Sequence, residues 1–190
     1  MGFKKAVFGL SLFVFTFSSV AGVITFDDYT TGDFTKIIDS YHGFTWNNMY
    51  VVRGAYQSGT GYERGVVSGD YAAFNGFGDD ASMLLSSDTE FDFNGAYFTG
   101  ALRNVAVTIS GFRNGAVVYQ ETIGASNDVA TWFDLNMLNI DQLSFSSKNS
   151  QFVMDNFTYN RTTSVPEPGT LSLLLVGSLA LFGFAWKKRG

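Results

Sequence analysis

Val105-Ala-Val-Thr-Ile-Ser-Gly-Phe-Arg-Asn114-Gly115-Ala-Val-Val-Tyr119 is the stretch that decides the fold class of this chain. Alternate residues from Val105 to Ile109 are apolar, which is the period of a strand with one buried face. Asn114-Gly115 is the preferred pair for a type I′ turn between antiparallel strands. Val117 and Tyr119 continue the alternation on the return strand. The stretch therefore predicts a β-hairpin.

Short β-type segments separated by Gly, Asn, Asp and Ser surround this hairpin, and no sustained 3.6-residue period interrupts them. They predict an all-β, antiparallel β-sandwich of jelly-roll type. The segment Arg53–Gly69, rich in Gly, Ser and Tyr, is expected to be a long surface excursion, where binding sites often lie. The expected strands lie near Val23–Phe26, Gly43–Val52, Tyr71–Phe74, Ser82–Leu85, Phe91–Thr99, Val105–Gly111, Ala116–Thr122, Thr131–Leu135, Ile140–Ser146 and Phe152–Tyr159.

Both ends of the chain differ from this pattern. Residues 1–21 place Lys4 and Lys5 before a short apolar run and end in small residues, which predicts a signal peptide cut between Ala21 and Gly22. Near the other end, residues 169–186 are apolar and uncharged, and they predict a transmembrane helix. A basic cluster, Lys187, Lys188 and Arg189, follows it and marks the cytoplasmic side.

An exported β domain of residues 22–163 remains between these ends. It holds seven Lys and Arg against 16 Asp and Glu, a net charge of −9, whereas the whole chain stands at −5. Such an acidic domain argues against a nucleic-acid partner, because nucleic acids are bound through clustered cations. The chain has no cysteine, which excludes disulfides, thiol nucleophiles and thiolate metal sites.

Residues 164–190 form a tail with a recognisable layout. A polar linker leads to Pro166-Glu167-Pro168, whose prolines hold the segment extended, and the apolar run and the basic cluster follow. This arrangement resembles the PEP-CTERM sorting domain of Gram-negative bacteria. The resemblance implies recognition by an exosortase, transient residence in the inner membrane, cleavage near the motif, and export linked to extracellular polysaccharide and biofilm. A permanent single-span anchor is the alternative that needs no role for Pro166-Glu167-Pro168.

The β domain is also loosely similar to other PEP-CTERM passengers and to carbohydrate-binding jelly rolls. The residues that carry this likeness are segments 24–28, 41–46, 91–97 and 152–157. It implies a fold and suggests a glycan ligand.

No residue stands out as catalytic. His42 is the only histidine, and a zinc site needs two or three such ligands. Beside Gly43 and Trp46, His42 is expected to be a loop or packing residue rather than part of a catalytic triad. Carboxylate-pair glycoside hydrolysis stays open as a distant alternative, since it needs only two suitably spaced acids. We therefore expect a protein that is not an enzyme and requires no cofactor.

Two binding sites are predicted within the domain. Asp27 and Asp28 after the first strand, with Asp155 and Asn156 in the last, would form a structural calcium site if these strands are neighbours. The other reading is that these acids are solvated turn residues. Tyr56 and Tyr62 lie among Gly, Ser and Gln, and are expected to be exposed and to contact a glycan.

The sequence thus predicts a non-enzymatic surface or matrix protein, with a lectin-like carbohydrate-binding module as the main alternative. After processing we expect it at the cell surface or outside the cell. The acidic pair Asp79-Asp80, after Gly76-Phe77-Gly78, is interpreted as an ordinary turn.

The processing of both ends can be measured by intact mass. The secreted form should lack residues 1–21 and the segment beyond Pro168. Replacing Pro166, Glu167 and Pro168 with alanine should leave the chain in the inner membrane, because the exosortase would no longer recognise it. Release of that variant as efficient as release of the parent would show that the tail is only an anchor.

Overall fold

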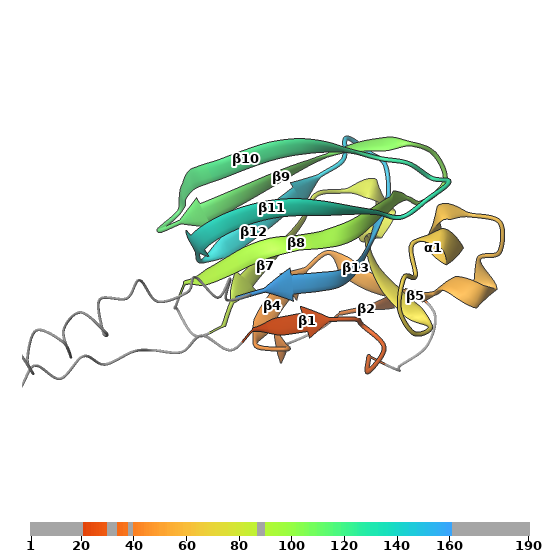
Figure 1. The fold of residues 1–190 in the computed structure, drawn as a ribbon, viewed down its shortest axis with the longest axis horizontal. Helices are drawn as coiled ribbons and strands as arrows, with labels where there is room; N and C mark the ends of the chain where they lie inside the picture. Colours follow the sequence, from red (N-terminus) through yellow and green to blue (C-terminus); the bar gives the residue numbers. More distant parts are fainter. Residues whose placement is uncertain (1–20, 30–33, 38–39, 87–89, 161–190) are drawn as a thin grey trace, which may run out of the picture. The chain divides into compact units, whose positions relative to one another are not determined.

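The computed structural model describes residues 21–29, 34–37, 40–86 and 90–160, which pack as two antiparallel sheets. Sheet A has the spatial order β11 (Thr131–Ile140), β8 (Phe91–Gly100), β13 (Phe152–Tyr159), β6 (Tyr71–Asn75), β5 (Met49–Arg53) and β2 (Thr35–Lys36), and β1 (Gly22–Ile24) also pairs with β13. Sheet B has the order β10 (Ala116–Ala125), β9 (Val105–Arg113), β12 (Gln142–Ser146), β7 (Ala81–Leu85), β4 (Phe44–Asn47) and β3 (Ser40–Tyr41). Figure 1 shows both layers.

The eight strands from β6 to β13 form a jelly roll. Along the chain they visit the sheets in the order A, B, A, B, B, A, B, A. Their spatial orders are β6-β13-β8-β11 in sheet A and β7-β12-β9-β10 in sheet B, so the last strand lies between earlier ones. Strands β2 to β5 extend the two sheets at one side. The predicted all-β antiparallel sandwich of jelly-roll type is therefore confirmed.

The predicted hairpin forms between β9 and β10. Asn114 and Gly115 have φ values of 51° and 75°, which the type I′ turn requires. The alternating apolar residues of β9 point into the core, where Val107 and Ile109 are fully buried. The alternation expected on β10 is wrong at Val117: a register shift between Val117 and Tyr119 turns the valine outward, to 53% exposure.

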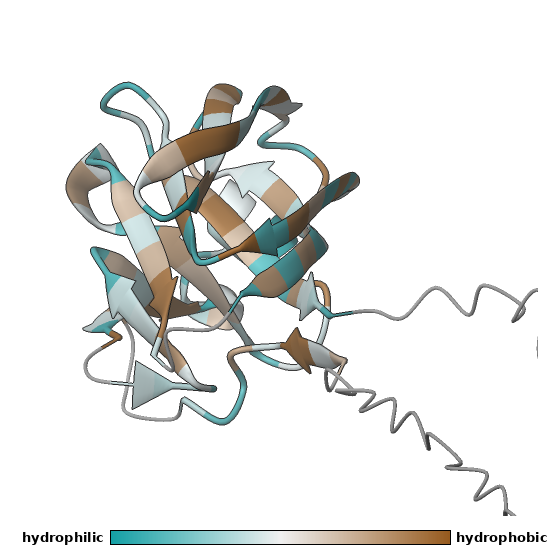
Figure 2. Cartoon of the chain, turned by 90° about the vertical axis from the view of Figure 1, so that its left-hand side faces the viewer, coloured by the Kyte–Doolittle hydropathy of each residue, from teal (hydrophilic) through white to brown (hydrophobic). Residues whose placement is uncertain are grey.

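Among the described residues, aromatic rings make up ten of the 28 buried residues of the core between the sheets. Phe93 of β8 stacks on Phe157 of β13 with ring centroids 4.6 Å apart, and Trp46 of β4 meets Phe157 edge-on at 5.8 Å. These geometries are the ones that aromatic quadrupoles favour. Figure 2 shows hydrophobic and hydrophilic bands alternating along the strands, as expected for sheets with one face in a core. Burial of this core takes the place of the disulfides that the chain lacks.

A second, smaller cluster lies on the outer face of sheet A. Val52, Phe74 and Val153 face away from the main core and pack with Tyr62. Tyr62 comes from the predicted excursion, which contains a 3₁₀ helix, η1 (Gly54–Tyr56), and a short α-helix, α1 (Gly61–Arg64) (Figure 1). Thr60 caps α1 by accepting from the Tyr62 backbone N–H. The excursion therefore covers the part of the outer face of sheet A formed by β5, β6 and β13.

Two carboxylates hold the end of this excursion. Asp155 of β13 accepts backbone hydrogen bonds from Val67 at 2.7 Å and Ser68 at 2.9 Å. Asp27 accepts from the backbone of Asp70 at 2.7 Å and Tyr71 at 3.0 Å. Burial raises the pKa of Asp155 to about 6, against these hydrogen bonds, and the nearby charge of Asp27 adds to the rise.

The terminal segments are not part of this description. Within the described ranges, no helix has the length and apolarity needed to cross a membrane. The predicted signal peptide, except for Ala21, and the predicted transmembrane helix at 169–186 lie outside these ranges. The predicted domain boundaries therefore stay predictions.

The raised pKa of Asp155 predicts a specific pH dependence of stability. The folded protein holds the proton up to about pH 6, whereas the unfolded chain loses it near 3.8. The stabilisation from this proton is thus full below pH 3.8 and is lost as the pH rises through about 6. Between pH 5 and 7 we expect a loss of roughly 1 kcal/mol in the free energy of unfolding.

Urea unfolding in the presence of a chelator measures this loss. Asp155→Asn should remove it, whereas Asp128→Asn, at an exposed turn, should keep it. An equal slope between pH 5 and 7 in the parent and in Asp155→Asn would contradict the assignment to Asp155.

Candidate functional site

The two tyrosines predicted to contact a glycan lie in different environments. Tyr56 is 63% exposed, and the Arg53 guanidinium lies over its ring at 5.1 Å from the centroid. Arg53 also donates to the Tyr56 hydroxyl and to Asp70. The expectation that Tyr62 is exposed is wrong, because its ring is 4% exposed and fills the cluster over sheet A.

The four residues of the predicted calcium site separate into two groups. β1 pairs with β13, so the expected neighbourhood of the first and last strands is confirmed. Asp27, Asp155 and Asn156 all bind the segment 67–71, where Asn156 accepts from the Ser68 hydroxyl at 2.7 Å. Asp28 turns away and binds Tyr41 and His42. Among the described residues, no three His, Asp or Glu side chains are grouped to hold a metal ion.

An aromatic groove lies where the turn after β6 meets the turn before β13. One hollow of about 180 Å³ is lined by Phe34, Tyr50, Phe74, Gly76, Phe77 and Gln151. A second, of about 370 Å³, is lined by Phe77, Gly78, Leu102, Arg103, Asn149, Ser150 and Gln151. Because the hollows share Phe77 and Gln151, we treat them as one site, the Phe77 groove.

Phe77 has an unusual backbone conformation and an exposed ring. It belongs to the 3₁₀ turn η2 (Gly76–Gly78) with φ 57° and ψ 6°, a left-handed conformation that bulky residues rarely adopt. Its side chain is 83% exposed and touches Tyr50 edge-on, with centroids 6.1 Å apart. Core packing therefore does not explain the phenylalanine, and such strain is characteristic of functional sites.

Asn75, which is fully buried, holds the turn that carries Phe77. Its side-chain nitrogen donates to the carbonyls of Asp79 and Ser150, both at 3.0 Å. Its side-chain oxygen accepts from the backbone N–H of Phe152 at 2.8 Å. One amide thus joins both walls of the groove, and a buried amide with satisfied partners keeps them in one arrangement.

Close contact between the two turns adds to this rigidity. Gly78 has φ 80°, and a Cβ there would lie 2.8 Å from the Asn149 carbonyl carbon, so only glycine fits. Asn48 donates to the carbonyls of Gly76 and Asp80 from the other side, at 3.1 Å each. The groove is therefore formed before any ligand arrives.

Polar side chains line the groove beside the rings. Gln151 accepts from the Tyr62 hydroxyl at 2.8 Å and donates to the Asn75 carbonyl at 3.2 Å, which orients its amide. Arg103 donates to the Ser150 hydroxyl at 3.0 Å. An apolar surface with a few oriented polar groups is the usual composition of a small-molecule or sugar site.

The groove was not predicted from the sequence, where residues 76–80 are interpreted as an ordinary turn. The available signal was the pattern Gly76-Phe77-Gly78, in which a large apolar residue stands between two glycines in a polar turn. Glycan-binding rings were expected within the excursion, but Tyr62 of the excursion only supports the groove, through its hydrogen bond to Gln151.

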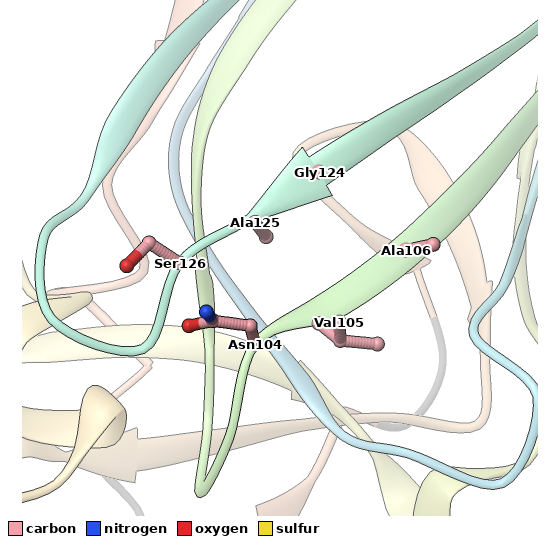
Figure 3. A pocket seen from close by; sticks show the side chains of 6 residues that line it. All are labelled: Asn104, Val105, Ala106, Gly124, Ala125 and Ser126. Carbon is pink, nitrogen blue, oxygen red and sulfur yellow. The ribbon is translucent and has the colours of Figure 1, made fainter.

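Another hollow, of about 360 Å³, lies at the ends of β9 and β10. It is lined by Asn104, Val105, Ala106, Gly124, Ala125 and Ser126 (Figure 3). These six residues include no aromatic ring and no charged group, so this hollow offers little to recognise a ligand.

A match to a known protein family is found for the C-terminal tail. Residues 164–189 match the model of the PEP-CTERM protein-sorting motif. The chain therefore carries the motif that Pro166-Glu167-Pro168 and the basic cluster predict, and this motif implies export and processing by an exosortase. The motif implies anchoring in the membrane before processing.

Comparison with solved structures concerns the β domain. A carbohydrate-binding module of family 61, solved in complex with β-1,4-galactotriose, is 13% identical, with a TM-score of 0.38. The match covers 73% of this chain and 97% of that one. No curated protein matches the chain.

The calcium ion stays a prediction that thermal unfolding can test. An ion bound only to the folded state at a hundredfold excess over Kd would stabilise by about 2.7 kcal/mol, which raises the melting temperature by several degrees. The melting temperature of Asp27→Asn should be the same in millimolar calcium and in chelator, whereas Asp80→Asn should keep the difference in melting temperature shown by the parent. If the parent protein melts at the same temperature with calcium and with chelator, no calcium binds there. The charges of Asp27 and Asp155 are then compensated by backbone N–H donors alone.

Proposed function

We propose that the exported β domain binds polysaccharide in the Phe77 groove and thereby holds the processed protein in the exopolysaccharide layer. The single observation that carries the proposal is the exposed ring of Phe77 on a strained turn. Strain of this kind costs about 1 to 3 kcal/mol and persists only where the surroundings impose it. Here the surroundings are Asn75, Asn48 and Gly78.

The chemistry of the groove fits a sugar. A pyranose has an apolar face of C–H groups and a rim of hydroxyls. The ring of Phe77 offers an apolar surface for that face, because removing both from water is favourable. Gln151, with one amide hydrogen and one oxygen lone pair still available, can bind a hydroxyl at the rim. Sugar binding therefore needs no movement of the groove.

Two alternatives are less well supported. Glycoside hydrolysis needs a pair of carboxyl groups on either side of the bond, and no Asp or Glu lines either hollow of the groove. A matrix protein without a specific ligand would not require an exposed ring on a strained turn. Association with biofilm follows from the proposal, because the sorted protein would meet the secreted polysaccharide outside the cell.

Substitutions of Phe77 test the proposal on the secreted protein. Phe77→Ala should weaken binding to immobilised polysaccharides, including the producing cell's own, by about tenfold or more, as loss of a central aromatic contact does. Phe77→Gly should weaken it equally. Glycine adopts a φ of 57° without strain, and little buried surface is lost with the exposed ring. Glycine also increases the conformational entropy of the unfolded chain, which opposes this gain. The unfolding free energy should therefore stay within about 1 kcal/mol of the parent.

Tyr56→Ala is the matched control, since Tyr56 is an exposed ring outside the groove. It should bind as the parent does. If Tyr56→Ala loses binding and Phe77→Ala keeps it, the ligand lies at the excursion and the assignment to the groove is wrong.

A further inference from the structure

Among the described residues, Arg103 and Arg64 form no ion pair with a carboxylate, and of these two only Arg103 lines the groove. Arg53 forms an ion pair with Asp70 at 3.1 Å, and Arg113 forms one with Glu90 at 3.2 Å. Arg103 has no carboxylate within 4.0 Å among the described residues, although the domain carries a net charge of −9. Its one assigned bond goes to the neutral hydroxyl of Ser150. Within the described ranges, a cation without a carboxylate partner thus lies in an acidic domain, and it lines the groove.

The fold holds Arg103 in this place. It lies in the short turn between β8 and β9, in which the Ala101 N–H donates to the Gln151 carbonyl at 3.0 Å. A Cβ at Gly100 would lie 2.0 Å from the carbonyl oxygen of Arg103, so no larger residue fits at position 100. The turn is therefore tied to the opposite wall of the groove, and the bond to Ser150 orients the guanidinium.

Arg103 is the one charged side chain among the described residues that line this end of the groove. Lys148 precedes Asn149, which lines the same hollow, and it is exposed without an ion pair to any described carboxylate. Asp79 and Asp80 follow Gly78 in the chain but do not line the hollow. A ligand in the groove therefore meets a guanidinium with most of its five donors unused by described residues.

We propose that the groove selects polysaccharides whose sugar rings carry carboxylates, with one ring on Phe77 and its carboxylate, or that of the next residue, on Arg103. The proposal rests on the proposed function. The fork of a guanidinium matches a carboxylate in two parallel hydrogen bonds, and the charge strengthens both. A neutral sugar would leave Arg103 to its hydroxyl partner and gain nothing from the charge.

The test compares one polymer in two forms. Polygalacturonate and its carboxyl-reduced product share backbone and linkage and differ only in charge. The secreted protein should bind the acidic form about three- to tenfold more tightly at low salt, as expected for a partly exposed charge pair. The preference should shrink as salt is added.

Arg103→Gln should abolish the preference, so that the variant binds polygalacturonate and the reduced polymer with equal affinity. Lys148→Gln, an exposed control of equal charge change, should keep the preference. Since Arg103 is exposed, Arg103→Gln should have the same melting temperature as the parent, which a thermal unfolding measurement checks.

The outcomes separate the two proposals. Equal binding of both polymers by the parent, or an undiminished preference in Arg103→Gln, would overturn the selection for acidic sugars, while sensitivity to Phe77→Ala would still support the groove. Binding of heparin but not of polygalacturonate would overturn the assignment to carboxylates in favour of sulfate. Absence of binding to any of these polymers and to the cell's own polysaccharide would overturn both proposals.

Discussion

The side-chain amide of Asn75 connects three segments that are far apart in the sequence: the end of β6, the η2 turn and the start of β13. It is fully buried, so each of its bonds replaces a bond to water that the folded chain cannot make. Loss of the amide would leave unsatisfied backbone groups in both turns. The position of Phe77 and the closeness of Gly78 to Asn149 both depend on this one group.

The aromatic residues serve three different purposes in this fold. Rings such as Phe93 and Phe157 fill the space between the sheets. Tyr62 and Phe74 seal the outer face of sheet A beneath the excursion, with centroids 5.4 Å apart. Phe77 alone among these five stands almost fully in solvent. The groove is therefore continuous with a packed layer, because Phe74 belongs both to that layer and to the lining.

Residue periodicity predicts the sandwich well, because each strand has one face in the main core and the side-chain period of two records it. It fails for Tyr62, whose burial depends on Val52 and Phe74 on the far face of sheet A. The signal was present in segments such as Tyr71–Asn75, which are apolar on both faces and need cover on both. The pattern Gly76-Phe77-Gly78 marks the ring of the groove, but the opposite wall could not be predicted, since the two walls meet through Asn75 rather than through any local pattern.

The position of β13 has a consequence for the time at which the domain can fold. β13 is the last strand of the domain to be synthesised, and it pairs with β1, β6 and β8. Sheet A cannot close until this strand arrives, because three of its six described strand pairings involve β13. A chain that crosses a membrane from its N-terminus therefore stays without its central strand until almost all of it is across. The topology thus makes completion of sheet A depend on the last strand of the described domain.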